Sequence, residues 1–180
     1  MIEQINLEDL KIDSLRQLMQ KSQTTRIPFV IKNFYTPMFD WNFAIKFLNK
    51  CMVEKEENTH ITKTGDYYFI LQPNENYHGL YSEYYEIINK SHPDGVILIP
   101  VILVSIFNNV PNLTEHADPV DQMHLAISGV SNWKLTMDDG STEELCLSPG
   151  DFIFLPKLIK HEVTSISHRI GLTFSSNHTL

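Results

Sequence analysis

The pattern of hydrophobic and polar residues changes about halfway along the chain. Apolar residues recur close to helical spacing over Leu7–Met19, which predicts an amphipathic helix. A second helix is expected over Asp40–Leu48, where Asp40 can cap the N-terminus. A short strand is predicted between them at Ile27–Ile31, and a strand at Tyr67–Leu71 and a helix at Leu80–Ile88 follow. Residues 1–95 are therefore expected to contain the helices and the first strands.

From Val96 onward the pattern becomes one of short strands. Apolar-rich runs of four to eight residues alternate with turn-forming residues such as Pro149-Gly150, which is typical of a sandwich or a small barrel. The clearest hairpin is centred on Asp139-Gly140, between strands expected at 133–137 and 143–147. That dipeptide is typical of a type I′ turn. We therefore predict a barrel core over residues 96–176.

The composition indicates one globular domain. The chain has 180 residues, of which 42% are hydrophobic and 20% charged, and this mixture is too apolar for a disordered protein. Neither a linker nor a repeat divides it, so a single domain over residues 1–180 is predicted. Cys51 and Cys146 are too few for a disulfide framework, which suits a reducing compartment.

Charge and hydropathy argue against two classes of partner. The formal net charge of -8 repels a phosphate backbone, so nucleic acid is not an expected partner. The longest apolar run, Val96–Phe107, is interrupted by Pro100 and Ser105 and is shorter than the roughly 20 residues that span a bilayer. The start of the chain lacks the basic and apolar segments of a secretory signal. We expect no membrane association and a cytoplasmic location.

Three residues in the second half form a candidate metal site. His116 and Asp118 are two positions apart, so in an extended segment their side chains lie on the same side. His161 lies 43 residues later, at the start of another expected strand, and a closed barrel can bring it beside them. Two histidines and one carboxylate on one face of an octahedral ion leave three adjacent positions open, as non-haem iron(II) oxygenases require.

The surroundings of these residues match the two motifs of the cupin barrel. The second motif is reproduced by Gly150, Pro156 and His161, with Leu158 where simple cupins often have glycine. The first motif is reproduced at the same spacings by His116, Asp118, Gln122 and Gly129. On these motifs the chain resembles the JmjC and cupin-like family of iron(II)- and 2-oxoglutarate-dependent oxygenases.

The resemblance implies a fold, a reaction and a set of ligands. The implied fold is mainly β: a double-stranded β-helix, the cupin or jelly-roll barrel, with N-terminal helices packed outside it. His116, Asp118 and His161 fall on the family's metal triad, which holds Fe(II) and carries the catalysis. The implied reaction is hydroxylation of a small metabolite, amino acid, peptide or protein side chain, coupled to decarboxylation of 2-oxoglutarate. A homodimer is a further possibility.

The cosubstrate site departs from the family pattern. Ser131 stands where the family often has a lysine or arginine that binds the distal carboxylate of 2-oxoglutarate. Arg169 is the expected replacement, because it lies on the polar face of the last strand, whereas Lys134 has the opposite parity to Ser131. The residues expected to bind the cosubstrate are Arg169, Tyr68, Thr173 and Gln122, and those expected in the substrate pocket are His124, Trp133 and Ser131.

Two alternatives remain open from the sequence. One is a non-catalytic cupin-like module that binds a metal and a metabolite, which the serine at position 131 favours. The other is a metal-dependent cupin enzyme that does not use 2-oxoglutarate, although Asp118 in place of a histidine argues against it.

Overall fold

The computed structural model describes residues 2–6, 12–36, 41–42, 45–46, 49, 60–64, 68–72, 82–95 and 98–176. Among the elements with described bounds, the helices are α1 (Ile12–Thr25) and α3 (Ser82–Ser91). The strands are β1 (Glu3–Asn6), β2 (Phe29–Lys32), β3 (His60–Thr64), β4 (Tyr68–Gln72), β5 (Leu98–Ser105), β6 (Val110–Ala117), β7 (Gln122–Ser128), β8 (Ser131–Thr136), β9 (Thr142–Leu147), β10 (Phe152–Leu155), β11 (Lys160–Ser165) and β12 (Arg169–Ser176).

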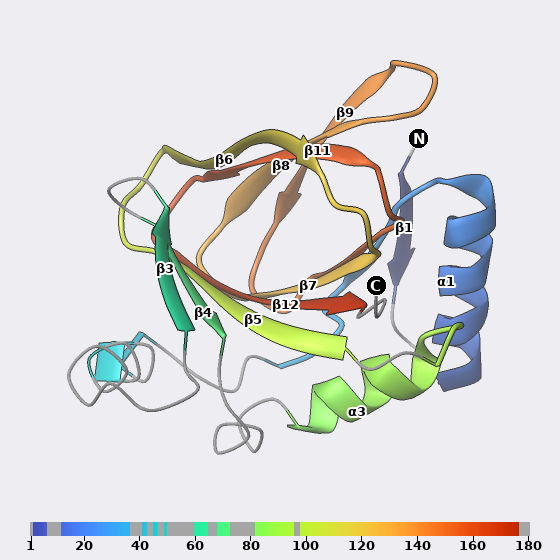
Figure 1. The fold of residues 1–180 in the computed structure, drawn as a ribbon, viewed down its shortest axis with the longest axis horizontal. Coiled ribbons are helices and arrows are strands. Elements are labelled where there is room, and N and C mark those ends of the chain that lie inside the picture. The colour runs from blue at the N-terminus through green and yellow to red at the C-terminus, as the bar shows by residue number, and fades with distance from the viewer. Residues whose placement is uncertain are drawn as a thin grey trace.

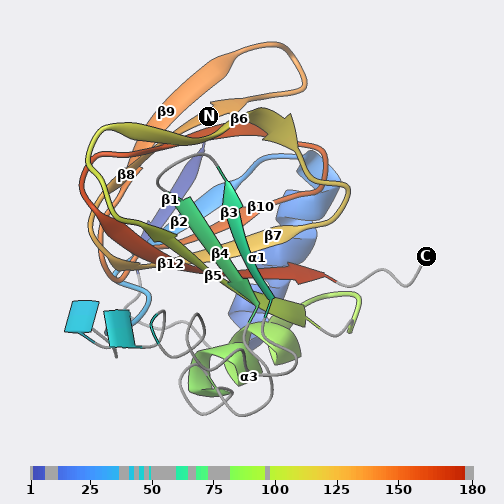
Figure 2. The ribbon, with the colours of Figure 1, turned by 60° about the vertical axis from the view of Figure 1, so that its left-hand side comes forward.

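Two sheets face each other and form the barrel. The larger has the order β1-β2-β10-β7-β12-β5-β4-β3, and the smaller has the order β6-β11-β8-β9. From β5 to β12 the chain passes repeatedly between the two sheets, which enclose a common interior (Figures 1 and 2). This is the topology of a jelly roll. The predicted double-stranded β-helix is therefore confirmed.

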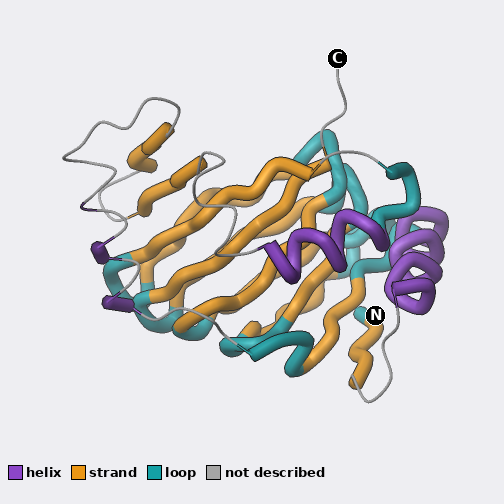
Figure 3. Tube along the Cα trace, turned by 90° about the horizontal axis from the view of Figure 1, so that it is seen from below, coloured by secondary structure: helices purple, strands orange, loops and turns teal. Residues whose placement is uncertain are grey.

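The outer face of the larger sheet is apolar. Side chains alternate between the two faces of a strand, and the apolar ones of these strands fall on the outer face. On β7 and β12, one side-chain set packs against the helices, and the same cluster includes Leu15 and Met19 of α1 and Ile88 of α3. Figure 3 shows both helices lying against this sheet from outside. The strand residues of this outer core are Phe29, Ile31, Leu98, Ile102, Val104, Met123, Leu125, Ile127, Phe152, Phe154, Ile170, Leu172 and Phe174.

The opposite face of the larger sheet looks into the barrel. There, Val30, Ala126 and Ile153 pack against Trp133 and Leu135 of the smaller sheet. The inward positions further along β7 and β12 are polar or small, and this end of the interior forms the cavity described below. The barrel therefore has an apolar inner core at one end and, at the other, a cavity lined by both polar and apolar residues.

The N-terminal predictions have different outcomes. The first helix is present as α1, and the helix predicted at 80–88 is present as α3, displaced towards the C-terminus. The strands predicted at 27–31 and 67–71 correspond to β2 and β4. Residues 7–11 and most of the helix predicted over Asp40–Leu48 lie outside the described residues. No described helix has both the length and the apolar character needed to cross a membrane.

The predicted hairpin joins β8 and β9, but its turn is not of type I′. Of the two central residues only Gly140 has a positive φ, of 81°. The Gly140 N–H donates to the Met137 carbonyl at 2.9 Å, and the Met137 N–H donates to the Ser141 carbonyl at 2.8 Å. This is a three-residue loop, a type I turn closed by a glycine bulge. Asp139 stabilises this loop by accepting the Ser141 N–H at 2.8 Å. In such a loop the left-handed conformation falls on Gly140 and not on Asp139.

Candidate metal centre

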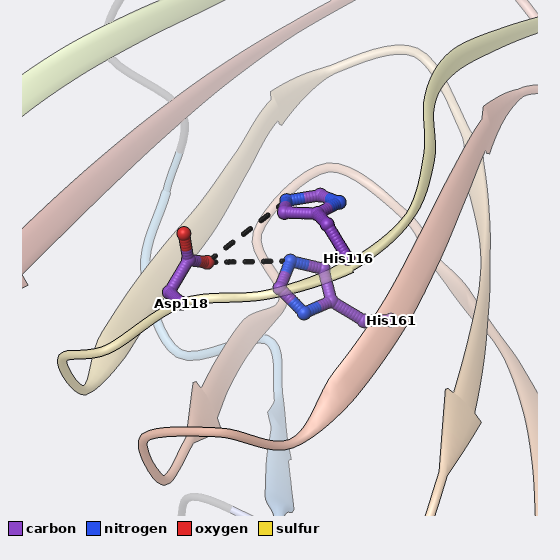
Figure 4. A group of neighbouring side chains, drawn as sticks. All are labelled: His116, Asp118 and His161. Carbon is purple, nitrogen blue, oxygen red and sulfur yellow. Dashed lines mark ion pairs between the residues drawn. The ribbon is translucent and has the colours of Figure 1, made fainter.

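The structure brings His116, Asp118 and His161 together on the inner side of the smaller sheet. His116 on β6 lies directly opposite His161 on β11, and their ring centroids are 4.3 Å apart. Asp118 follows the end of β6, and its Oδ2 lies 3.5 Å from His161 Nε2 and 4.0 Å from His116 Nε2. Figure 4 shows the carboxylate facing both rings. The three candidate ligand atoms therefore point toward one position.

Backbone carbonyls orient both imidazole rings. His161 Nδ1 lies 3.1 Å from the carbonyl oxygen of Ile159, and His116 Nδ1 lies 2.9 Å from that of Thr114. A carbonyl can only accept, so each Nδ1 carries a proton, and in the neutral ring the lone pair is on Nε2, the atom that faces Asp118. Metal-bound histidines are commonly held by such a hydrogen bond from the other ring nitrogen. Burial also lowers the pKa of His161, which favours the neutral ring that a metal needs.

A second group consists of His92, Asp94 and Asp121, whose ligand atoms also lie within 4.8 Å of one another. Its histidine, however, has the opposite tautomer. His92 Nδ1 accepts the Asp94 N–H at 3.4 Å, so its proton is on Nε2, which faces Asp121 Oδ2 at 3.5 Å. The amide of Gln23 donates to both carboxylates. The histidine of this group therefore presents a proton rather than a lone pair toward Asp121, which does not suit metal binding, and among the described residues this nitrogen has no partner at hydrogen-bonding geometry.

The triad opens onto a cavity of about 240 Å³ inside the barrel. Its wall combines the three candidate ligands with polar residues of β7 and β12 and with aliphatic residues from both sheets. The lining residues are Val101, Leu103, His116, Asp118, Gln122, His124, Trp133, Leu155, His161, Val163, Arg169, Thr173 and Ser175.

His124 lies at the centre of this wall and is neutral. Burial, the positive charge of Arg169 and the proximity of His161 lower its pKa well below the ordinary value. Its Nδ1 is 2.8 Å from the Thr173 hydroxyl, and its ring lies against the indole of Trp133 with centroids 5.0 Å apart. Within the described part of the chain, the buried Nε2 has no hydrogen-bond partner. His124 is thus a rigid neutral part of the wall.

Gly171 creates the space that His124 occupies. A Cβ at position 171 would lie 2.2 Å from His124 Cε1 and 2.7 Å from its Nε2, far inside van der Waals contact. The sequence gives a signal for this contact only after the pairing of β7 and β12 is known, because the two residues are 47 positions apart. The requirement for glycine was therefore missed in the sequence analysis.

Of the predicted cosubstrate residues, those whose side chains the structure describes lie on the wall of this cavity. Arg169 is 2% exposed, and it lines the cavity together with Thr173 and Gln122. Gln122 Oε1 accepts the Ser175 hydroxyl at 2.8 Å. Tyr68 begins β4, where its backbone pairs with β5, but its side chain lies outside what the structure describes.

The predicted pocket residues differ in position. His124 and Trp133 line the cavity, whereas Ser131 does not. The Ser131 hydroxyl accepts the indole N–H of Trp133 at 2.9 Å, and this bond holds it within the barrel wall. Lys134 is exposed on the opposite face of β8, as its parity predicted. Ser131 therefore orients a cavity residue instead of facing the cavity itself.

Structural comparison identifies the fold. An X-ray structure of YcfD from Escherichia coli matches with a TM-score of 0.70 at 14% sequence identity, covering 91% of this chain and 53% of YcfD. A variant of oxalate decarboxylase from Bacillus subtilis matches with a TM-score of 0.51 at 11% identity, covering 68% of this chain and 28% of that enzyme. The chain has a cupin fold. These matches support the cupin-like resemblance inferred from the sequence motifs.

A second E. coli YcfD structure, described as a ribosomal oxygenase in complex with cobalt and succinic acid, matches with a TM-score of 0.62 at 16% identity. It covers 86% of this chain and 49% of YcfD, so this chain spans about half of YcfD's length. No family model matches the sequence, and no curated protein matches it significantly. The likeness at these identities is one of fold.

Proposed function

We propose that the protein is a non-haem iron(II)- and 2-oxoglutarate-dependent oxygenase. One observation carries the proposal: two histidine lone pairs and a carboxylate converge on the wall of a cavity that also contains a buried arginine. The arrangement combines the open three-ligand site of such enzymes with a cation that can bind a dicarboxylate. The YcfD structure supports it, since that structural neighbour was solved in complex with both a metal, cobalt, and a dicarboxylic acid, succinic acid.

The donor set fits a small divalent ion. Two ligands at a right angle on an ion about 2.1 Å away are about 3.0 Å apart. The Asp118 oxygen lies 3.5 Å from His161 Nε2 and 4.0 Å from His116 Nε2, so each ligand needs to move inward by less than about 1 Å. Imidazole nitrogens with one carboxylate suit iron(II). His116, Asp118 and His161 would therefore hold Fe(II).

The remaining residues of the cavity would bind and shield the reactants. Fe(II) in such a site supplies coordination positions for a 2-oxo acid and dioxygen and the oxidising chemistry. Arg169 would bind the distal carboxylate of 2-oxoglutarate, and Thr173, Gln122 and Tyr68 would donate or accept hydrogen bonds around it. The aliphatic residues of both sheets would exclude water from the reacting groups.

The substrate class follows from the size and charge of the site. A cavity of about 240 Å³ accommodates a small metabolite or a single side chain of an amino acid, peptide or protein, and the net charge of -8 disfavours nucleic acid. The ribosomal oxygenase activity stated for YcfD favours a protein side chain among these.

The decisive experiment is an anaerobic titration of the Fe(II)-loaded protein with 2-oxoglutarate. Wild-type protein should develop the weak visible charge-transfer band of a bidentate 2-oxo acid on iron, and Asp118→Ala should bind neither metal nor cosubstrate. Substrate-dependent conversion of 2-oxoglutarate to succinate would then identify the substrate.

A matched pair of cation variants tests the arginine. Arg169→Gln should weaken 2-oxoglutarate binding at least tenfold while Fe(II) still binds, because a buried charge-assisted bond is lost. Lys134→Gln removes a cation from the exposed face of β8 and should change neither. Stoichiometric iron without a band in the wild type would contradict the proposal and leave a metal-dependent cupin enzyme or a binding module.

A further inference from the structure

Asp121 is a buried carboxylate that the candidate metal centre does not use. It lies in the turn between β6 and β7, three residues after Asp118, and is 3% exposed. A buried carboxylate is costly unless its oxygens accept hydrogen bonds. Asp121 Oδ1 accepts the backbone N–H of Lys157 at 2.7 Å, and Oδ2 accepts the Gln23 amide at 2.8 Å. The carboxylate thus joins three segments: α1, the β6–β7 turn and the β10–β11 loop.

The loop that Asp121 contacts leads directly into the strand that carries one metal ligand, and it touches another. In this loop the N–H of Leu158 donates to the Asp118 carbonyl at 2.7 Å, and the Ile159 carbonyl orients the ring of His161. The backbone at residues 157–159 therefore positions both Asp118 and His161. A displacement of this loop would move two of the three ligands relative to His116.

The loop is held in an unfavourable conformation. Leu158 has a φ of 66°, in the left-handed region that disfavours residues other than glycine, and its side chain is 55% exposed. A leucine in this conformation is strained and persists only where its surroundings fix the backbone. The N–H groups of Lys157 and Leu158, bonded to Asp121 and to the Asp118 carbonyl, fix the backbone that enters Leu158.

We propose that Asp121 is a positioning residue for the metal centre: it fixes the strained β10–β11 loop so that Asp118 and His161 converge. The inference rests on the proposed metal site. Asp121 acts through hydrogen-bond geometry, anchored on α1 by Gln23, and touches neither the metal nor the reactants.

The test compares three variants. Asp121→Ala removes both acceptors, whereas Asp121→Asn keeps an oxygen for the Lys157 N–H, the bond that holds the loop, and gives up only the acceptor that faces Gln23 and His92. Asp151→Ala is the matched control. Asp151 is also 3% exposed and also accepts a backbone N–H, from Ser148 at 2.8 Å, but it lies at the far end of β10 from this loop.

The first readout is the affinity for Co(II), measured from its visible absorption. Loss of a supporting hydrogen bond near a metal ligand typically costs 10–100-fold in affinity. We expect Asp121→Ala to bind Co(II) about tenfold more weakly and to show an altered ligand-field spectrum, because the ligands no longer converge. Asp121→Asn should stay within about threefold of wild type. Asp151→Ala should lose stability but keep the wild-type affinity and spectrum.

The second readout needs no metal. In the metal-free protein, amide hydrogen exchange at Lys157 and Leu158 should be faster in Asp121→Ala than in Asp151→Ala. Equal exchange in these two variants, wild-type Co(II) affinity in Asp121→Ala, or equal loss of affinity in Asp151→Ala would overturn the positioning role. Equal loss in Asp121→Asn would also overturn it, because that variant keeps the bond to the Lys157 N–H. If the wild-type protein fails to bind Co(II), the proposed metal function is refuted, and the positioning role of Asp121 is refuted with it. This holds even if hydrogen exchange shows that Asp121 constrains the loop.

Discussion

The contact between Gly171 and His124 gives a quantitative prediction. The Cβ of Gly171→Ala would lie 2.2 Å from His124 Cε1, whereas carbon atoms at optimal separation lie about 3.5–4.0 Å apart. The ring must therefore move by more than about 1 Å. Trp133 blocks one direction, and any displacement strains the 2.8 Å contact between His124 Nδ1 and the Thr173 hydroxyl. Overpacking costs about 1–3 kcal/mol and a lost hydrogen bond about 1 kcal/mol, so we predict a destabilisation of about 2–3 kcal/mol.

A double-mutant cycle isolates this contact. In a His124→Ala background the obstructing ring is gone, and Gly171→Ala should be neutral or stabilising by about 0.5 kcal/mol, because alanine loses less chain entropy than glycine in a strand. The coupling free energy should exceed about 1.5 kcal/mol. Guanidinium unfolding of the four proteins measures this coupling free energy. A chelator is added throughout, because bound metal would otherwise add to the stability of the folded state. An equal cost of Gly171→Ala in both backgrounds would refute this explanation of the glycine.

Two further predictions concern pH and turn geometry. Because His124 stays neutral in the folded state, unfolding takes up a proton below its unfolded pKa of about 6.5, and the free energy of unfolding should fall by about 1 kcal/mol from this residue as the pH drops from 7.5 to 5.5. His124→Asn should remove that part of the slope in denaturant titrations, and an unchanged slope would contradict a neutral His124. Gly129→Ala should destabilise the protein far more than Gly140→Ala, since both have positive φ but only a Cβ at 129 meets backbone, 2.1 Å from the His168 carbonyl oxygen. Similar melting temperatures for these two variants would argue against that steric difference.

The features that sequence patterns predicted are those with a short repeat. Alternation on the last strand separates Ile170 and Leu172 from Arg169 and Thr173, and the structure places the two sets in the outer core and on the cavity wall. Likewise, the spacing of two residues between His116 and Asp118 depends only on local extended geometry. Both patterns are local consequences of strand structure, so they can be predicted from the sequence alone.

Most of the features that escaped prediction depend on contacts between distant segments. Asp121 is three residues from a predicted ligand, yet its partners Gln23 and Lys157 come from α1 and from a loop that joins the other sheet. Ser131 was expected to face the pocket, but its hydroxyl instead accepts the indole N–H of Trp133, two residues along the same strand, a local contact that strand parity does not predict. The partners of Asp121 are brought together only when the barrel closes.

The alternation on β7 and β12 also bears on how such a barrel can diversify. Met123, Leu125 and Leu172 hold the helices against the sheet, while His124 and Thr173, their immediate chain neighbours, face the cavity. Substitutions that alter the ligand need not loosen the helical layer, because the two tasks fall on opposite faces of the same strands. Drift and selection can therefore act on adjacent codons almost independently. Among relatives of this chain, residues at the cavity-facing positions should vary with the molecule bound, while their neighbours should vary only in apolar volume.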